Sequence, residues 1–130
     1  MKIQIAYKFT GEDRKQLEKD MKKVCSALKS KGHDVYCTLF DKNLPKTKKE
    51  LFQNAFNRIN NSEIILVLIK SEDKSEGLLM EVGYSIANKK RIILAIKNAV
   101  KNTHLRDLVE EIIEFEDIDD LINKLNEFNI

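Results

Sequence analysis

The residues best suited to chemistry lie in one short segment, from Ser75 to Ala87, which reads as a loop that turns into a helix. Apolar side chains occupy almost every side of this helix, a pattern typical of a buried helix. A single carboxylate, Glu81, stands among them. An acid in such surroundings must face a pocket, pair with a partner, or lose its hydration at high cost. Glu81 is therefore the first candidate for a catalytic residue.

Two interpretations of Glu81 are open. It could be a structural acid, bonded for instance to the hydroxyl of Ser85 one turn further on. It could instead be a functional carboxylate, because acids with perturbed pKa values gather at active sites. We favour the second, since Glu81 lies in the first two turns, where the helix dipole favours an ionised acid. Gly77 and Gly83 flank it, and a glycine within a helix costs about 1 kcal/mol, so Gly83 is expected to serve packing or access.

The rest of the chain supplies alternating strands and helices that would position this segment. Strands are expected at 2–8, 33–39, 63–69, 91–96 and 112–115, and the other helices at 10–31, 48–60, 98–110 and 117–128. Such alternation predicts the α/β class, a three-layer α/β/α sandwich around a five-stranded parallel sheet. The first, third and fourth strands are the most apolar, which favours the flavodoxin-like strand order 2-1-3-4-5.

This strand order predicts where a ligand would bind. In such sheets, ligands lie beyond the carboxyl ends of the strands, where the order switches between strands 1 and 3. The loops at that place are 8–13 and 71–77, and the second leads directly to Glu81. We expect Glu81 to open onto a pocket that these two loops and the 41–45 loop enclose.

The Glu81 segment resembles the signature of the nucleoside 2-deoxyribosyltransferase family and of its relatives that hydrolyse nucleoside monophosphates. The resemblance covers residues 55–97 and is carried by Ser75, Gly77, Glu81, Gly83 and Tyr84. It implies that Glu81 is the nucleophile, which attacks the anomeric carbon and expels the base. The resulting glycosyl ester would pass to water or to a second base. The resemblance implies no cofactor, and a nucleoside or nucleotide as substrate.

Three positions depart from the family pattern. Ser75 stands where the deoxyribosyltransferases have an aspartate. A serine at this position resembles the pattern of the monophosphate hydrolases instead. A second family aspartate, upstream of the nucleophile, corresponds to Ala55. The tyrosine of the first strand falls near Ile3 or Ile5, so Tyr7 is close but out of register. The expected function is hydrolysis, or transfer, at the N-glycosidic bond of a nucleoside 5′-monophosphate or related nucleotide.

Substrate-binding residues are expected in the loops around Glu81. Ser75 could bond to a phosphate or sugar oxygen, and the amides from Thr10 to Glu12 could cradle an anion at a helix start. Lys8 could add a positive charge, or could simply be a solvated strand end. The expected set comprises Tyr7, Lys8, Phe9, Thr10, Gly11, Asp41, Ser75 and Gly77.

Two other classes of function stay open. A TIR-like domain shares the strand order and a serine at the position of Ser75, and would cleave NAD or bind proteins. The tryptophan of that group is missing here, because the chain contains none. A non-catalytic nucleotide-binding module is the other alternative, since Ala55 replaces a family acid.

Composition limits what else the chain can be. Its 130 residues suffice for one domain, 1–130. The net charge of +2 is too small to indicate a nucleic-acid polymer as partner. The two histidines are isolated and the two cysteines lack metal-ligand spacing, so no metal site is expected.

The same sequence predicts a compartment and an assembly. No signal peptide and no apolar run that could span a bilayer is recognised, which favours a cytoplasmic protein with free thiols and no membrane partner. The family resemblance implies a dimer or larger oligomer. The apolar surroundings of Glu81 exceed the needs of one small core, so we expect a homodimer through the second and third helices.

Overall fold

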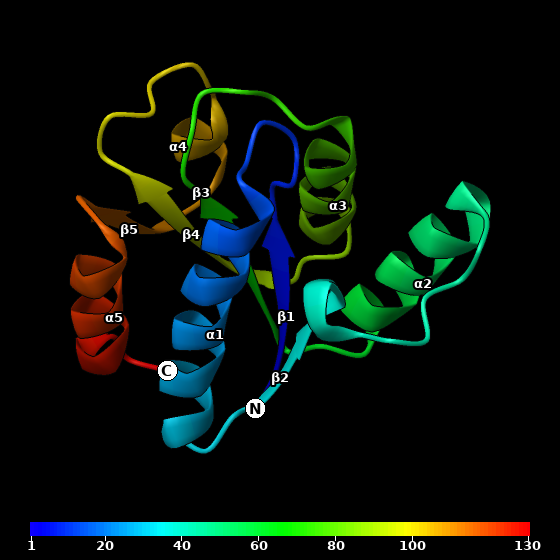
Figure 1. Ribbon diagram of the computed structural model, residues 1–130, viewed down its shortest axis with the longest axis horizontal. Coiled ribbons are helices and arrows are strands. Elements are labelled where there is room, and N and C mark those ends of the chain that lie inside the picture. The colour runs from blue at the N-terminus through cyan, green and yellow to red at the C-terminus, as the bar shows by residue number, and fades with distance from the viewer.

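The computed structural model describes residues 1–130 and has the α/β/α architecture that the sequence predicts (Figure 1). Five strands form one sheet in the order β2-β1-β3-β4-β5, and every neighbouring pair is parallel. They are β1 (Lys2–Tyr7), β2 (Asp34–Cys37), β3 (Ile64–Ile69), β4 (Arg91–Lys97) and β5 (Glu111–Phe115). The predicted strand order is thereby confirmed.

Helices cover both faces of the sheet. They are α1 (Arg14–Ser30), α2 (Lys48–Asn60), α3 (Glu76–Ala87), α4 (Leu105–Leu108) and α5 (Ile118–Glu127), with a short 3-10 helix at Thr38–Phe40. One hydrophobic cluster joins the sheet to α1 and α5, and a second joins its other face to α2, α3 and α4. Figure 1 shows α1 and α5 side by side on one face. None of the helices combines the length and the apolar composition that crossing a membrane requires.

The central strand β3 explains why both layers form. Its six residues are all buried. Alternate side chains point to opposite faces of a strand, so Ile64, Leu66 and Leu68 join the α1–α5 cluster while Ile65, Val67 and Ile69 join the other. An unbroken apolar run is the expected signature of a strand that helices cover on both faces.

Two predicted helix boundaries are wrong. Helix α1 begins at Arg14, not at Thr10, because Gly11 adopts a left-handed φ of +76° that a helix cannot continue. The helix expected at 98–110 shrinks to Leu105–Leu108. There, the carboxylate of Glu72 accepts hydrogen bonds from the amides of Lys101 and Asn102, which fixes this part of the chain as a loop.

Helix α3 is less buried than its composition predicts. Leu78 and Val82 are buried, but Leu79, Met80 and Ile86 are 42%, 47% and 40% exposed. A Cβ built on Gly83 would meet nothing within 4 Å, so Gly83 serves no packing contact within the chain. The apolar surroundings that the sequence predicts for α3 therefore cover only one side of the helix.

Helix α2 also packs loosely. Ile59 is its only fully buried residue, and Figure 1 shows the helix leaning away from the sheet. Its contact with α3 is aromatic, because the ring of Phe56 stacks on Tyr84 with 4.4 Å between the centroids. Its other apolar side chains are half-buried, and none of them is exposed.

Candidate active site

The start of α3 is set by Ser75. Its backbone is extended, and its hydroxyl accepts a hydrogen bond from the amide of Leu78 at 3.3 Å, as an N-cap residue does. The helix that follows places Glu81 in its second turn. The Ser75 hydroxyl oxygen therefore already has a backbone partner, and the hydroxyl proton stays free for a ligand.

Glu81 is half-buried, and its carboxylate has no protein partner. No hydrogen bond or ion pair reaches its side chain, and Ser85 donates to the backbone carbonyl of Glu81, at 2.7 Å, not to its carboxylate. The structural interpretation based on a bond to Ser85 is therefore wrong. Burial raises the pKa of Glu81 to about 7. Desolvation thus outweighs the helix dipole, against our expectation that the helix start favours the ionised form.

Tyr7, the last residue of β1, is the neighbour of Glu81. Burial raises the pKa of the Tyr7 phenol, and the nearby Cys37 thiol and Glu81 carboxylate raise it further. Strand β2 ends at Cys37, which pairs with Ile5, so the end of β1 has no strand beside it on this side. The phenol of Tyr7 is therefore a neutral hydrogen-bond donor at the open end of the sheet, close to the carboxylate.

Two basic or aromatic side chains near Tyr7 escaped the sequence analysis. The Arg14 guanidinium opposes the rise of the Tyr7 pKa, and Tyr36 of β2 adds to it, so both lie around the same phenol. Arg14 also lies over the ring of Phe9, 5.7 Å from its centroid. No sequence pattern marks these two residues, because the fold alone brings α1 and β2 to the end of β1.

Asp41 belongs to a second group of side chains, and Tyr36 links this group to the side chains around Tyr7. The hydroxyl of Tyr36 donates to Asp41 at 2.6 Å, and the amide of Asn43 donates to its other oxygen at 2.9 Å. These two bonds lower the pKa of Asp41. The guanidinium of Arg58 lies 4.0 Å from the centroid of the Tyr36 ring. Asp41 is thus held ionised, and Arg58 is a further residue that the sequence analysis missed.

Lys8 points away from Tyr7, on the opposite face of β1. It is only 3% exposed, and its ammonium donates to the hydroxyl of Ser71. Ser71 in turn donates to Glu12 at 2.9 Å. The structure therefore shows a buried, bonded lysine at the position where the sequence allows a solvated strand end.

The loop after β1 exposes Phe9 and Thr10, and Gly11 brings it against the loop before α3. A Cβ on Gly11 would lie 2.0 Å from a carboxylate oxygen of Asp73. The amide of Glu12 donates to the carbonyl of Phe9, at 3.2 Å. Of the three amides expected to cradle an anion, those of Thr10 and Gly11 are therefore the two without a protein acceptor.

Gly77 lies near α2. A Cβ at this position would lie 3.6 Å from the ring of Phe52, an ordinary contact distance. Ala55, which stands at the position of a family aspartate, is half-buried on the same helix. The residue of α2 that lies near Gly77 is therefore the apolar Phe52, and no acid occupies the position of Ala55.

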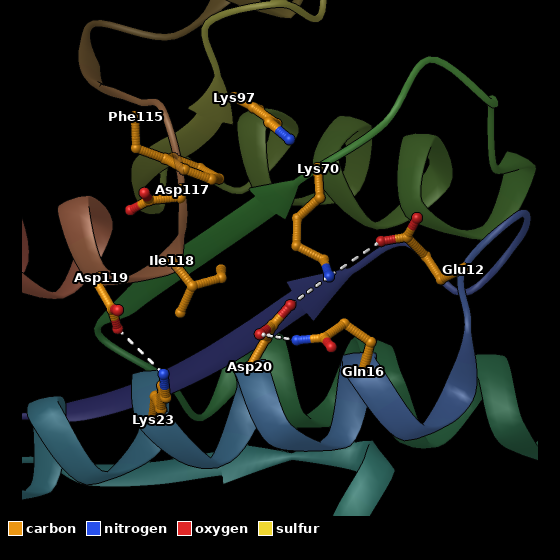
Figure 2. A pocket seen from close by; sticks show the side chains of 10 residues that line it. All are labelled: Glu12, Gln16, Asp20, Lys23, Lys70, Lys97, Phe115, Asp117, Ile118 and Asp119. Atoms are coloured by element: carbon orange, nitrogen blue, oxygen red, sulfur yellow. Dashed lines mark hydrogen bonds and ion pairs between the residues drawn. The ribbon is translucent and has the colours of Figure 1, made fainter.

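The main cavities of the chain do not include the expected pocket around Glu81. None of the five main cavities is lined by Glu81. A polar cavity of about 420 Å³ lies elsewhere, between α1 and α5 (Figure 2). Among His, Cys, Asp and Glu, no group of three or more side chains could hold a metal ion. Cys25 and Cys37 are both buried free thiols.

A parallel sheet of this order, with an unpaired acid and a tyrosine beyond its strand ends, defines a flavodoxin-like α/β protein with the elements of a catalytic site. Residues 6–120 match the family model described as nucleoside 2-deoxyribosyltransferase. The chain therefore belongs to the nucleoside 2-deoxyribosyltransferase family and is an enzyme of this nucleoside glycosidase and transferase kind. No curated protein matches its sequence.

Solved structures share the fold. The CMP N-glycosidase BcmB of Clostridium botulinum is 18% identical, with a TM-score of 0.76, over 98% of this chain and 100% of that one. A 2-deoxyribosyltransferase of Bacillus psychrosaccharolyticus is 24% identical, with a TM-score of 0.68, over 95% and 91%. A conserved protein of Enterococcus faecalis is 14% identical, with a TM-score of 0.66, over 98% of both chains.

Proposed function

We propose that the chain hydrolyses the N-glycosidic bond of a nucleoside 5′-monophosphate or a related nucleotide, with Glu81 as nucleophile. The observation that carries the proposal is the half-buried, partner-free carboxylate of Glu81 near the phenol of Tyr7. Family membership supports a reaction at a nucleoside, and one protein of the same fold is named a CMP N-glycosidase.

The reaction would proceed in two steps. A carboxylate oxygen of Glu81 attacks the anomeric carbon, and the base leaves with the electrons of the glycosidic bond and takes a proton from solvent. Water then hydrolyses the glycosyl ester and releases Glu81 as a carboxylate. Tyr7 would orient the nucleophile by donating its phenolic hydrogen, which its raised pKa keeps in place.

The surroundings favour water over a second base as acceptor. Ser75 does not supply the carboxylate found at this position in the transferases. Asp41, an acid near Tyr36, accepts two hydrogen bonds that lower its pKa. An ionised Asp41 cannot donate a proton to a departing base, so protonation falls to solvent.

A phosphate of the substrate would bind at the start of α1. The ammonium of Lys8 is engaged by Ser71, which leaves Arg14 as the accessible cation near Tyr7. Its only ion pair is the exposed contact with Glu18 at 3.2 Å, and exposed pairs of this kind are weak. A guanidinium can grip a phosphate with two hydrogen bonds, and the free amides of Thr10 and Gly11 lie in the same loop.

We further propose that a second copy of the chain completes the site. Leu79, Met80 and Ile86 expose an apolar stripe on α3, and Gly83 lies open between them. Helix α2 beside it has only one fully buried residue. A homodimer through α2 and α3 would bury this surface and close the region around Glu81.

Release of base from a panel of nucleosides, nucleotides and NAD, resolved by chromatography, tests the proposal. Glu81→Gln keeps the shape of the side chain and removes the nucleophile, so we expect a loss of several orders of magnitude, at least ~4 kcal/mol of barrier. Nucleotide binding should survive. Glu76→Gln, on the exposed first turn of α3, is the matched control.

The same panel separates the alternatives. Equal background rates for the wild type and Glu81→Gln would refute the enzyme and favour a nucleotide-binding module, which the missing acid at Ala55 would suit. Cleavage of NAD alone would favour the TIR-like alternative.

A further inference from the structure

A polar network lies beneath the loops that lead to Glu81. Lys8 donates to Ser71, and Ser71 donates to Glu12. The other oxygen of Glu12 lies 3.5 Å from the ammonium of Lys70. Lys70 also bonds to Asp20 at 2.6 Å. Figure 2 shows the last two contacts at the edge of the polar cavity.

The charged groups of the network are largely buried. Asp20 is 5% exposed as a residue, and the side chains of Glu12 and Lys70 are 9% and 16% exposed. Two lysines face two acids, so the charges balance, and a buried set is tolerated only under that condition. Replacing such a set by apolar residues often stabilises a protein, so stability alone is a poor reason for it.

The positions of its members suggest a better reason for the network. Lys8 and Glu12 belong to the loop between β1 and α1, whereas Lys70 and Ser71 belong to the loop between β3 and α3. Ser71 is the one residue that bonds to both Lys8 and Glu12. Lys70 extends the connection to Asp20, in the body of α1, which Gln16 holds with a bond of 2.9 Å. Both loops are thereby fastened to each other and to α1.

We propose that Ser71 and Glu12 are positioning residues of the Glu81 site, which lock the β1–α1 loop to the β3–α3 loop. The inference rests on the proposed function, because Thr10 and Gly11 in one loop and Ser75 in the other are its phosphate contacts. The network holds these contacts at a fixed separation. Without the lock, both loops remain folded but no longer converge on one phosphate.

Steady-state kinetics of two Ser71 variants test this role. Ser71→Ala removes the hydroxyl that joins the loops, and Ser71→Thr retains it. We expect Ser71→Ala to raise KM for a nucleoside monophosphate about fivefold, the worth of one hydrogen bond. It should leave kcat within about twofold and change KM for the unphosphorylated nucleoside less. Ser71→Thr should restore KM.

Lys23→Ala is the matched control. It breaks an ion pair with Asp119 on the same face of the molecule, where both side chains are largely exposed and neither loop is involved. KM should not change in this variant. Should Ser71→Ala fail to fold, Glu12→Ala serves in its place, because it removes the acceptor of the Ser71 hydroxyl and so separates the two loops while the Lys8–Ser71 bond remains.

Hydrogen exchange gives a readout independent of catalysis. The amides of residues 9–12 and 72–75 should exchange faster in Ser71→Ala than in the wild type or in Lys23→Ala. Unchanged exchange overturns the inference whatever the activity. Faster exchange with an unchanged KM overturns it too, because the network would then be structural only. If the wild type releases no base, the proposed function fails, and calorimetric affinity for the monophosphate replaces KM.

Discussion

At the scale of single residues, the chain combines an acid whose pKa burial raises to about 7 with a phenol that burial keeps protonated. Glu81 and Tyr7 are close enough to influence each other, yet neither has an ion-pair partner. A carboxylate that must attack carbon has to be ionised and poorly solvated at once. With a pKa of about 7, Glu81 is poorly solvated and still partly ionised near neutral pH.

The first prediction is a pH profile. Because only ionised Glu81 can attack, kcat/KM should rise about tenfold per pH unit up to a pH of about 7 and level off above it. Rates of base release between pH 4 and pH 9 measure this limb. A midpoint near 4.5, the ordinary value for a glutamate, would contradict the role assigned to burial.

The second prediction concerns stability. Between pH 4.5 and about 7 the unfolded chain has an ionised Glu81 and the folded chain a protonated one, so stability falls as pH rises through this window. The loss is at most about 3 kcal/mol. Glu81→Gln removes it, so urea denaturation should show the variant more stable than the wild type at pH 8 and similar to it at pH 4. A variant less stable at both would mark Glu81 as a structural acid.

At the scale of elements, the sequence predicts the features that neighbouring residues determine and misses those that distant residues determine. The apolar runs of β3 and β4, and the helix stop at Gly32 with its φ of +88°, are local features, and their predictions are confirmed. The shortened α4 could not be predicted, because its cause is distant in sequence. Glu72 accepts hydrogen bonds from the amides of Lys101 and Asn102, which would have belonged to the longer helix.

The residues of the candidate site also fall into those that the sequence predicts and those that it misses. The segment from Ser75 to Glu81 could be found because its residues are neighbours in sequence and one carboxylate stood out among apolar side chains. Arg14 and Tyr36 could not, because they come near the end of β1 only after the sheet has formed, and Arg58 meets the Tyr36 ring only after α2 has packed. The burial of Lys8 was equally hidden, since Ser71 reaches it from another strand end.

The third prediction compares two glycines with positive φ. Gly11→Ala and Gly32→Ala both force alanine into the left-handed region, which costs about 1 kcal/mol. Only Gly11 also sets its new Cβ against Asp73, whereas Gly32 has nothing within 4 Å. Denaturation midpoints should therefore fall further for Gly11→Ala. Equal losses would mean that the two loops do not touch.

At the scale of the whole molecule, apolar surface is distributed unevenly. The α1–α5 face closes over its own core, while α3 leaves Leu79, Met80 and Ile86 at least 40% exposed. Apolar stripes of this kind mark contact with another protein surface.

The fourth prediction tests which surface covers the stripe. Leu79→Lys should convert the proposed homodimer to a monomer in sedimentation equilibrium and lower the rate of base release with it. Glu76→Lys introduces a lysine on the exposed start of α3 without removing apolar surface, so it should remain dimeric. A wild-type chain that sediments as a monomer at high concentration would exclude the dimer.

The loose seating of α2 has a consequence for how a substrate enters. One fully buried residue, Ile59, and the stack of Phe56 on Tyr84 hold the helix to the body. Elements with so few buried contacts detach first in local unfolding. Tyr7 ends strand β1 and Glu81 lies on α3, whereas Phe52, which lies against Gly77 at the start of α3, belongs to α2. A substrate would thus enter where α2 detaches from the start of α3, and contact with a second copy of the chain through α2 would slow that opening.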